Sequence, residues 1–173
     1  MSSFDGVPLI LTLALNDEAQ TYFNELRKQH FPPARNFLAA HVTLFHHLPG
    51  AKHAAIAESL TAVAAEQALL PLVVTGLRFL GRGVAYTLEN RTLQTLHKQL
   101  QTHWQPYLTP QDHQKLSPHV TVQNKVDPAT ARALHAKLSA DFQPFEATGT
   151  GLQLWAYRGG PWEALKLFPF QNH

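Results

Sequence analysis

The tripeptide His-Val-Thr occurs twice in this chain, at 41–43 and at 119–121, and the segments that follow the two copies resemble each other. Each copy is followed by a helical pattern and then by a related run, TGLRFL at 75–80 and TGLQLW at 150–155. Internal repetition constrains the whole fold, because both copies are expected to adopt the same local structure. Two copies predict two similar lobes rather than a long array of repeats.

Hydrophobic periodicity and turn residues divide the chain into strands and helices in the same order in each half. Asn16 and Asp127 are typical capping residues before helices, and Gly81-Arg82-Gly83 predicts a hairpin turn. The expected helices cover 17–31, 49–67, 91–107 and 127–142. The expected strands lie at 8–15, 41–48 and 119–126, with two more within 71–89 and two within 145–170.

This order predicts an α+β fold. We expect a bilobal, duplicated arrangement in which two mainly antiparallel sheets, with helices on their outer sides, meet around a pseudo-twofold axis. A length of 173 residues suits one domain, so residues 1–173 are expected to form a single bilobal domain. The central cleft between the sheets is the expected site.

The two motifs place the same chemistry on two strands. Side chains at positions i and i+2 share one face of a strand, so His41 projects with Thr43, and His119 with Thr121. One neutral imidazole can accept a proton while the other, as imidazolium, donates one near neutral pH. The threonine hydroxyls can donate to non-bridging phosphate oxygens. If the lobes are related by a pseudo-twofold axis, the four groups converge on one cleft, and they suit a phosphodiester.

Coincidence and a structural role are the competing explanations of these histidines. A chain of this composition contains about one His-x-Thr by chance, so a single copy is weak evidence. Two identical copies at matched positions of a repeat are far rarer, which favours the catalytic interpretation.

Composition narrows the remaining classes of function. The chain has 11 histidines and no cysteine, which excludes disulfides and thiolate chemistry and favours a reducing compartment. The apolar run at 7–15 is too short to span a bilayer and follows Asp5 rather than a basic segment, so we expect neither an anchor nor a signal peptide. A cytoplasmic protein with no membrane and no protein partner is expected. The net charge of +2 hints only weakly at an anionic partner.

The paired motifs resemble those of the 2H phosphoesterase superfamily, which is defined by two His-x-Thr/Ser motifs with a hydrophobic x. The second motif, Pro118-His119-Val120-Thr121, is similar to the bacterial 2'-5' RNA ligase-like branch. The resemblance covers nearly the whole chain. It implies a bilobal fold, phosphodiester chemistry without a metal or other cofactor, and RNA ends or nucleotides with a 2',3'-cyclic phosphate or a 2'-5' linkage as substrates. His41 and His119 would be the catalytic pair.

The chain also departs from the family pattern. The branch often has an arginine shortly after the second motif, where this chain has Gln123, Asn124 and Lys125. Lys125 is therefore the candidate substitute as a phosphate-binding cation. After the first motif, two histidines replace the more usual apolar residues, which raises the alternative of a metal hydrolase. Those two, His46 and His47, form a cluster of possible metal ligands with His41 and His53, but no nearby carboxylate completes a ligand set.

Aromatic and basic side chains supply further candidates for substrate contact. Phe45 is expected on the same strand face as His41 and Thr43. Tyr157 lies near the second hairpin between Trp155 and Trp162, where aromatic faces could stack on an unpaired base. Such residues are more often part of a core. Two arginines at the hairpin turns, Arg82 and Arg158, could contact phosphate but usually do nothing specific at such positions.

The motifs predict a phosphodiesterase, and the resemblance implies that it opens a 2',3'-cyclic phosphate, with RNA ligation through a 2'-5' linkage as the reverse reaction. The main alternative is a non-catalytic module that binds RNA ends or nucleotides. Two intact proton-transfer motifs argue against that module, because a binding protein needs neither.

Overall fold

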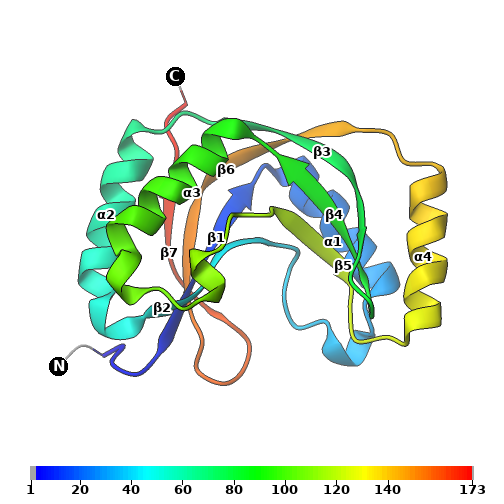
Figure 1. Ribbon diagram of the computed structural model, residues 1–173, viewed down its shortest axis with the longest axis horizontal. Helices are drawn as coiled ribbons and strands as arrows, with labels where there is room; N and C mark the ends of the chain where they lie inside the picture. Colours follow the sequence, from blue (N-terminus) through cyan, green and yellow to red (C-terminus); the bar gives the residue numbers. More distant parts are fainter. Residues whose placement is uncertain (1–2, 173) are drawn as a thin grey trace.

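One antiparallel sheet extends through both halves of the chain in the computed structural model, which describes residues 3–172 (Figure 1). Its order is β2-β1-β6-β3-β4-β5, with β7 paired to β6. The strands are β1 (Pro8–Leu15), β2 (Val42–Pro49), β3 (Leu70–Phe79), β4 (Val84–Glu89), β5 (His119–Gln123), β6 (Phe145–Ala156) and β7 (Glu163–Pro169). The predicted strands are therefore present, and the α+β class with a mainly antiparallel arrangement is confirmed.

The expectation of two separate sheets is wrong. The first five residues of β6, 145–149, pair with β3, and the segment 149–156 pairs with β1. The later part of β6 also pairs with β7 on its other side. β6 therefore joins the two halves into a continuous sheet, because it continues as one strand where its partner changes from β3 to β1.

The strand order has the same pattern from either edge. A motif strand is outermost (β2 or β5), a central strand follows (β1 or β4), and a long strand comes third (β6 or β3). This order is what a pseudo-twofold duplication would give, although duplication itself stays a prediction. The two edge strands β2 and β5 nevertheless lie next to each other, so the sheet curves back and brings the motif strands together.

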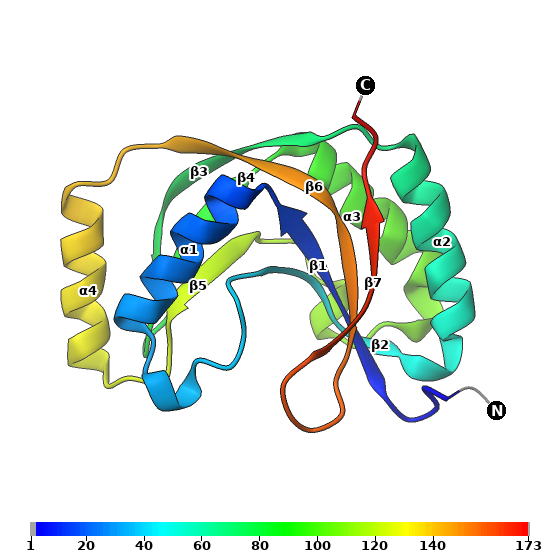
Figure 2. The same cartoon turned by 180° about the vertical axis from the view of Figure 1, so that it is seen from behind.

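Four helices cover the sheet in two pairs. α1 (Asp17–His30) packs against β5, and α4 (Pro128–Ala140) against β3 and β4. At the other end of the molecule, α2 (His53–Glu66) packs against β7 and β6, and α3 (Arg91–Trp104) lies beside it (Figure 2). His97 in α3 is buried, and its Nε2 donates to the carbonyl oxygen of Leu44 in β2 at 2.9 Å. Within residues 3–172, no helix is both long and apolar enough to cross a membrane.

Capping side chains explain where two of these helices begin. Asn90 Oδ1 accepts from the Leu93 N–H before α3, and Asp127 Oδ1 accepts from the Thr130 N–H before α4. Asn16 precedes α1 as expected but does not cap it. Its Oδ1 accepts from the Thr148 N–H instead, which ties the start of α1 to β6.

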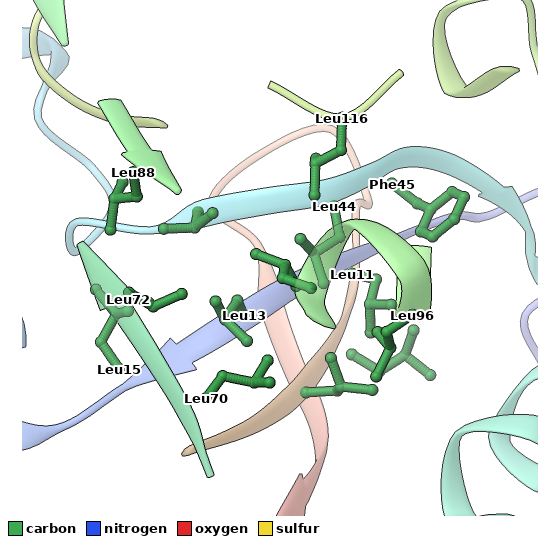
Figure 3. Close-up of a cluster of buried hydrophobic side chains, with 14 of the residues drawn as sticks. Leu11, Leu13, Leu15, Leu44, Phe45, Leu70, Leu72, Leu88, Leu96 and Leu116 are labelled. Atoms are coloured by element: carbon green, nitrogen blue, oxygen red, sulfur yellow. The ribbon is translucent and has the colours of Figure 1, made fainter. Parts of the chain in front are cut away.

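The hydrophobic core fills the inner side of the curved sheet and continues across both halves (Figure 3). It includes buried side chains from all seven of these strands, from α1, α2 and α3, and from the segment before β5. The labelled side chains of the cluster in Figure 3 are Leu11, Leu13, Leu15, Leu44, Phe45, Leu70, Leu72, Leu88, Leu96 and Leu116.

Asp112, in the segment before β5, fastens that segment to β2. Its side chain is only 2% exposed. Its carboxylate accepts from the backbone N–H of His46 at 2.8 and 3.0 Å and from that of His47 at 2.9 Å, and it pairs with His46 Nδ1 at 3.1 Å. Burial acts to raise the pKa of Asp112, but these hydrogen bonds outweigh burial and lower the pKa below its usual range. The carboxylate is therefore ionised at neutral pH and attaches the segment before β5 to the backbone of β2.

Replacement of Asp112 by alanine should lower the free energy of unfolding by about 2–4 kcal/mol, because the backbone N–H groups of His46 and His47 lose a charged acceptor. Denaturant unfolding at pH 7 measures the loss. Since the folded pKa is depressed, this stabilisation is present above the unfolded pKa and disappears as the pH falls through the folded pKa. The difference in the free energy of unfolding between parent and variant should therefore become smaller in acid. Asp141→Ala, at the exposed end of α4, should change stability by less than about 0.5 kcal/mol. Equal losses in the two variants would contradict this role.

Candidate active site

The two motifs present their polar side chains in the same way. Val42 and Val120 are completely buried, at 0% exposure. The histidine and threonine on either side of each valine are partly exposed. Strand alternation therefore places each imidazole beside its hydroxyl, as the sequence predicts.

Both histidines are held by the same local hydrogen bond. The Nδ1 of His41 lies 2.8 Å from the carbonyl oxygen of Ala39, and the Nδ1 of His119 lies 2.8 Å from that of Ser117. A carbonyl oxygen only accepts, so Nδ1 carries the proton in each ring. Nε2 is then the nitrogen left to exchange protons with a bound molecule, in both halves of the site.

Burial and nearby positive charge keep both imidazoles neutral. Burial lowers the pKa of His41 most strongly, and the charges of Arg27, His119 and His46 lower it further, against the raising effect of the Ala39 carbonyl. Burial likewise lowers the pKa of His119, with Arg78 and His46 adding to the effect.

Two cavities meet at His41. The larger cavity, about 570 Å³, is lined by His41 and Thr121 together with Arg27, Lys125 and Tyr157, among others. The smaller cavity, about 320 Å³, includes His41, Thr12, Gln20, Trp155 and Trp162 in its wall. Another depression, along α3, contains neither motif. Neither His119 nor Thr43 lines the two cavities at His41, although both are partly exposed.

The candidates Lys125 and Tyr157 line the larger cavity together with His41, and their contact with substrate stays a prediction. Both are exposed, Tyr157 to 42%. The two hairpin arginines have partners elsewhere in the protein. Arg82 donates through Nε to the Val126 carbonyl oxygen at 3.1 Å, and Arg158 forms an exposed ion pair with Glu163 at 2.8 Å. Neither of these arginines lines the larger or the smaller cavity.

The prediction that Phe45 contacts substrate is wrong, because its side chain is 0% exposed. It stacks on His97 with ring centres 4.6 Å apart and meets Trp104 edge-on at 5.1 Å. The strand pairing explains the error. Thr43 lies opposite Thr12 and Phe45 opposite Leu11, so the register shifts between them and the simple parity of the strand is lost.

Trp162, in contrast, lies directly against His41. Its ring centre is 4.8 Å from that of His41, and it meets Trp155 at 6.0 Å. Trp155 Nε1 donates to the Thr12 hydroxyl at 2.9 Å, which fixes the orientation of its indole. These two indoles form an aromatic wall of the smaller cavity.

Arg27 is the site residue that the sequence analysis missed. It is 4% exposed, its Nη1 donates to the Thr121 carbonyl oxygen at 2.9 Å, and its Nε donates to Asn36 Oδ1 at 3.1 Å. Its guanidinium also lies 4.1 Å from the centre of the Phe31 ring. One signal existed in the sequence: Arg27 continues the buried stripe of α1 that contains Ala19 and Phe23, at intervals of four residues.

The histidines after the first motif do not converge on a common point. His46 is bonded to Asp112, and His53 stacks on Phe4 with ring centres 4.4 Å apart. Among residues 3–172, no group of three or more potential ligands is arranged to hold a metal ion. The metal-hydrolase alternative therefore gains no support from the positions of these side chains.

Both motif histidines should titrate below the ordinary histidine pKa of about 6.5 in the free protein, because burial and neighbouring cations disfavour the imidazolium. An NMR titration of the ring carbons, assigned with His41→Asn and His119→Asn, measures both midpoints. The same resonances in urea-unfolded protein supply the reference. A midpoint at or above the reference for either ring would contradict this electrostatic account.

Comparison with known proteins places the chain in a family and identifies solved structures of the same fold. A family model described as the 2'-5' RNA ligase superfamily matches residues 15–161. A search of curated proteins finds no match to the chain. Among solved structures, TT0787 of Thermus thermophilus matches with a TM-score of 0.68 at 14% identity, over 96% of this chain and 99% of that one. E. coli LigT complexed with 3'-AMP matches with a TM-score of 0.58 at 20% identity, over 96% and 99% of the two chains.

At these identities the solved structures show a shared fold and nothing finer. The family model is the stronger finding, since it spans both His-Val-Thr motifs and most of the chain. The resemblance that the two motifs suggested is thereby confirmed, and the chain belongs to the 2'-5' RNA ligase superfamily of 2H phosphoesterases.

Proposed function

We propose that the protein is a metal-independent phosphodiesterase that opens a 2',3'-cyclic phosphate on a nucleotide or an RNA end. The observation that carries the proposal is the matched pair of histidines, each with Nδ1 bonded to a carbonyl and Nε2 left for proton transfer. E. coli LigT has been crystallised with 3'-AMP, NADP+ and ATP, so a relative of the same fold binds nucleotides. This supports a nucleotide substrate for the present chain.

The proposed reaction needs one neutral and one protonated imidazole. Nε2 of the neutral ring accepts a proton from water as the water oxygen attacks phosphorus. The bond from phosphorus to the 3' oxygen breaks, and the imidazolium gives its proton to that oxygen, which leaves a 2'-phosphate. The same sequence of steps, with a 5' hydroxyl in place of water as the attacking group, forms a 2'-5' linkage at the same site, and its reversal cleaves that linkage and restores the cyclic phosphate.

Threonine hydroxyls complete the proposed site. Thr43 and Thr121 each flank a catalytic histidine at i+2 and are partly exposed. As donors to the non-bridging oxygens, they stabilise the charge that develops on the pentacoordinate phosphorus. The indoles beside His41 supply a face on which a base can stack.

The test is incubation with the four nucleoside 2',3'-cyclic phosphates in the presence of EDTA, followed by chromatographic separation of the 2' and 3' products. We expect turnover to nucleoside 2'-phosphates, and we expect it to survive the chelator because both proton-transfer groups are imidazoles. Protein without turnover on any cyclic phosphate, including an oligonucleotide end, would overturn the proposal. Activity that needs added zinc or manganese would favour a metal hydrolase instead.

Single substitutions should separate the roles of the motif residues. His41→Ala and His119→Ala should each reduce kcat by about 10²- to 10⁴-fold, the usual range for a lost general acid or base. The double variant should lose less than the product of the two, because the rings act as a unit. His113→Ala, an exposed histidine outside both cavities, is the matched control. A folded single variant with the parent rate would exclude the two-histidine mechanism.

A further inference from the structure

The wall of the larger cavity is unusually basic. Arg27, Arg35 and Lys125 all contribute to it, while no aspartate or glutamate does. The three cations come from different elements: Arg27 from α1, Arg35 from the short 3₁₀ helix Pro33–Arg35, and Lys125 from the turn between β5 and α4. A local excess of charge of one sign attracts a partner of the opposite sign.

Arg27 shows that this charge is not balanced within the protein. A buried cation is costly unless it is paired, and Arg27 is only 4% exposed. Its identified acceptors are the Thr121 carbonyl oxygen and the Asn36 amide oxygen, which are both neutral. Among residues 3–172, no carboxylate forms an ion pair with it. Burial lowers its pKa, as expected for a cation without a counter-charge.

Lys125 is held at the same cavity by an unusual backbone. Its φ of 62° lies in the left-handed region, and no other residue apart from glycine does so within the described chain. The Lys125 N–H donates to Asn124 Oδ1 at 2.8 Å, which supports this turn. Such backbone conformations cost free energy and are retained mainly where they position a functional group.

The number of cations exceeds what one cyclic phosphate needs. A 2',3'-cyclic phosphate carries a single negative charge, and the two histidines and two threonines already surround it in the proposed reaction. The larger cavity, at about 570 Å³, extends from His41 and Thr121 towards the three cations. This volume accommodates a further nucleotide portion, and arginine pairs readily with phosphate through two parallel hydrogen bonds.

We propose that the larger cavity is a second phosphate subsite, formed by Arg27, Arg35 and Lys125, that binds the phosphate on the 5' side of the terminal nucleoside. The substrate class is then an RNA end with at least two phosphates rather than a free nucleoside cyclic phosphate. This inference rests on the proposed function for its position relative to the reacting phosphate. The existence of the subsite is independent of turnover.

The kinetic test compares adenosine 2',3'-cyclic phosphate with the same compound bearing a 5' phosphate, at low ionic strength. The parent protein should show a kcat/KM at least about 10-fold higher for the 5'-phosphorylated compound, because one well-formed charged contact contributes about that factor. Arg35→Gln and Lys125→Gln should each reduce this ratio several-fold. Arg91→Gln, which removes an exposed charge at the start of α3, should leave the ratio unchanged. Equal kcat/KM values for the two compounds in the parent would overturn the subsite.

Binding without turnover separates this inference from the proposed function. Adenosine 3',5'-bisphosphate and adenosine 3'-monophosphate are titrated by calorimetry into the parent, Arg35→Gln and Lys125→Gln proteins. We expect the bisphosphate to bind at least about 10-fold more tightly to the parent, and this preference to fall in both variants and with added salt. If the preference is present but no cyclic phosphate is opened, the subsite stands and the catalytic proposal fails. If cyclic phosphates are opened without any preference, the subsite is wrong.

The buried arginine needs a separate control, because its loss can also disturb the contact between α1 and β5. Arg27→Lys keeps the charge, and Arg27→Gln removes it. Both variants are first compared with the parent by thermal unfolding. For protein that remains folded, the bisphosphate preference should be lost in Arg27→Gln and partly kept in Arg27→Lys. The same preference in both variants as in the parent would show that Arg27 only supports the fold.

Discussion

Burial of one valine in each motif determines which way the motif histidines and threonines face. Val42 and Val120 are completely enclosed by the core, and alternation along a strand then turns the neighbouring histidine and threonine outward. The two strands occupy opposite edges of the sheet, so in a flat sheet their histidines and threonines would lie far apart. The curvature of the sheet brings β2 and β5 together, as the proposed shared site requires. Asp112 reinforces this approach, because it bonds the segment before β5 to the backbone of β2.

Much of this arrangement could be predicted from the sequence. The strands and helices are short periodic segments with clear turn residues, and the repeated tripeptide identifies the residues that can transfer protons. The faces of His41 and His119 follow from alternation within three residues. Such features depend on neighbours in the chain, which the sequence displays directly.

What could not be predicted depends on contacts between distant segments. The long β6 changes partner from β3 to β1 without any break in its sequence, so one sheet forms where two were expected. A register shift against β1 removes Phe45 from the face of Thr43. Arg27 lies 94 residues from Thr121 in the chain and contacts it only because α1 packs on β5. In each case the structure depends on a contact with a segment far away in the sequence, and the pattern of neighbouring residues does not reveal that contact.

In the proposed reaction, the electrostatics of the site link substrate binding to proton transfer. In the free protein, burial and neighbouring cations lower the pKa of both motif histidines, so neither is a ready acid. A phosphate between them changes this balance, because its negative charge favours the imidazolium and offsets the effect of Arg27 on His41. Binding and protonation are reciprocal, so the anion that raises the pKa of the histidines is itself bound more tightly when one of them is protonated. The acid of the proposed reaction thus forms mainly in the complex, where its proton has an acceptor.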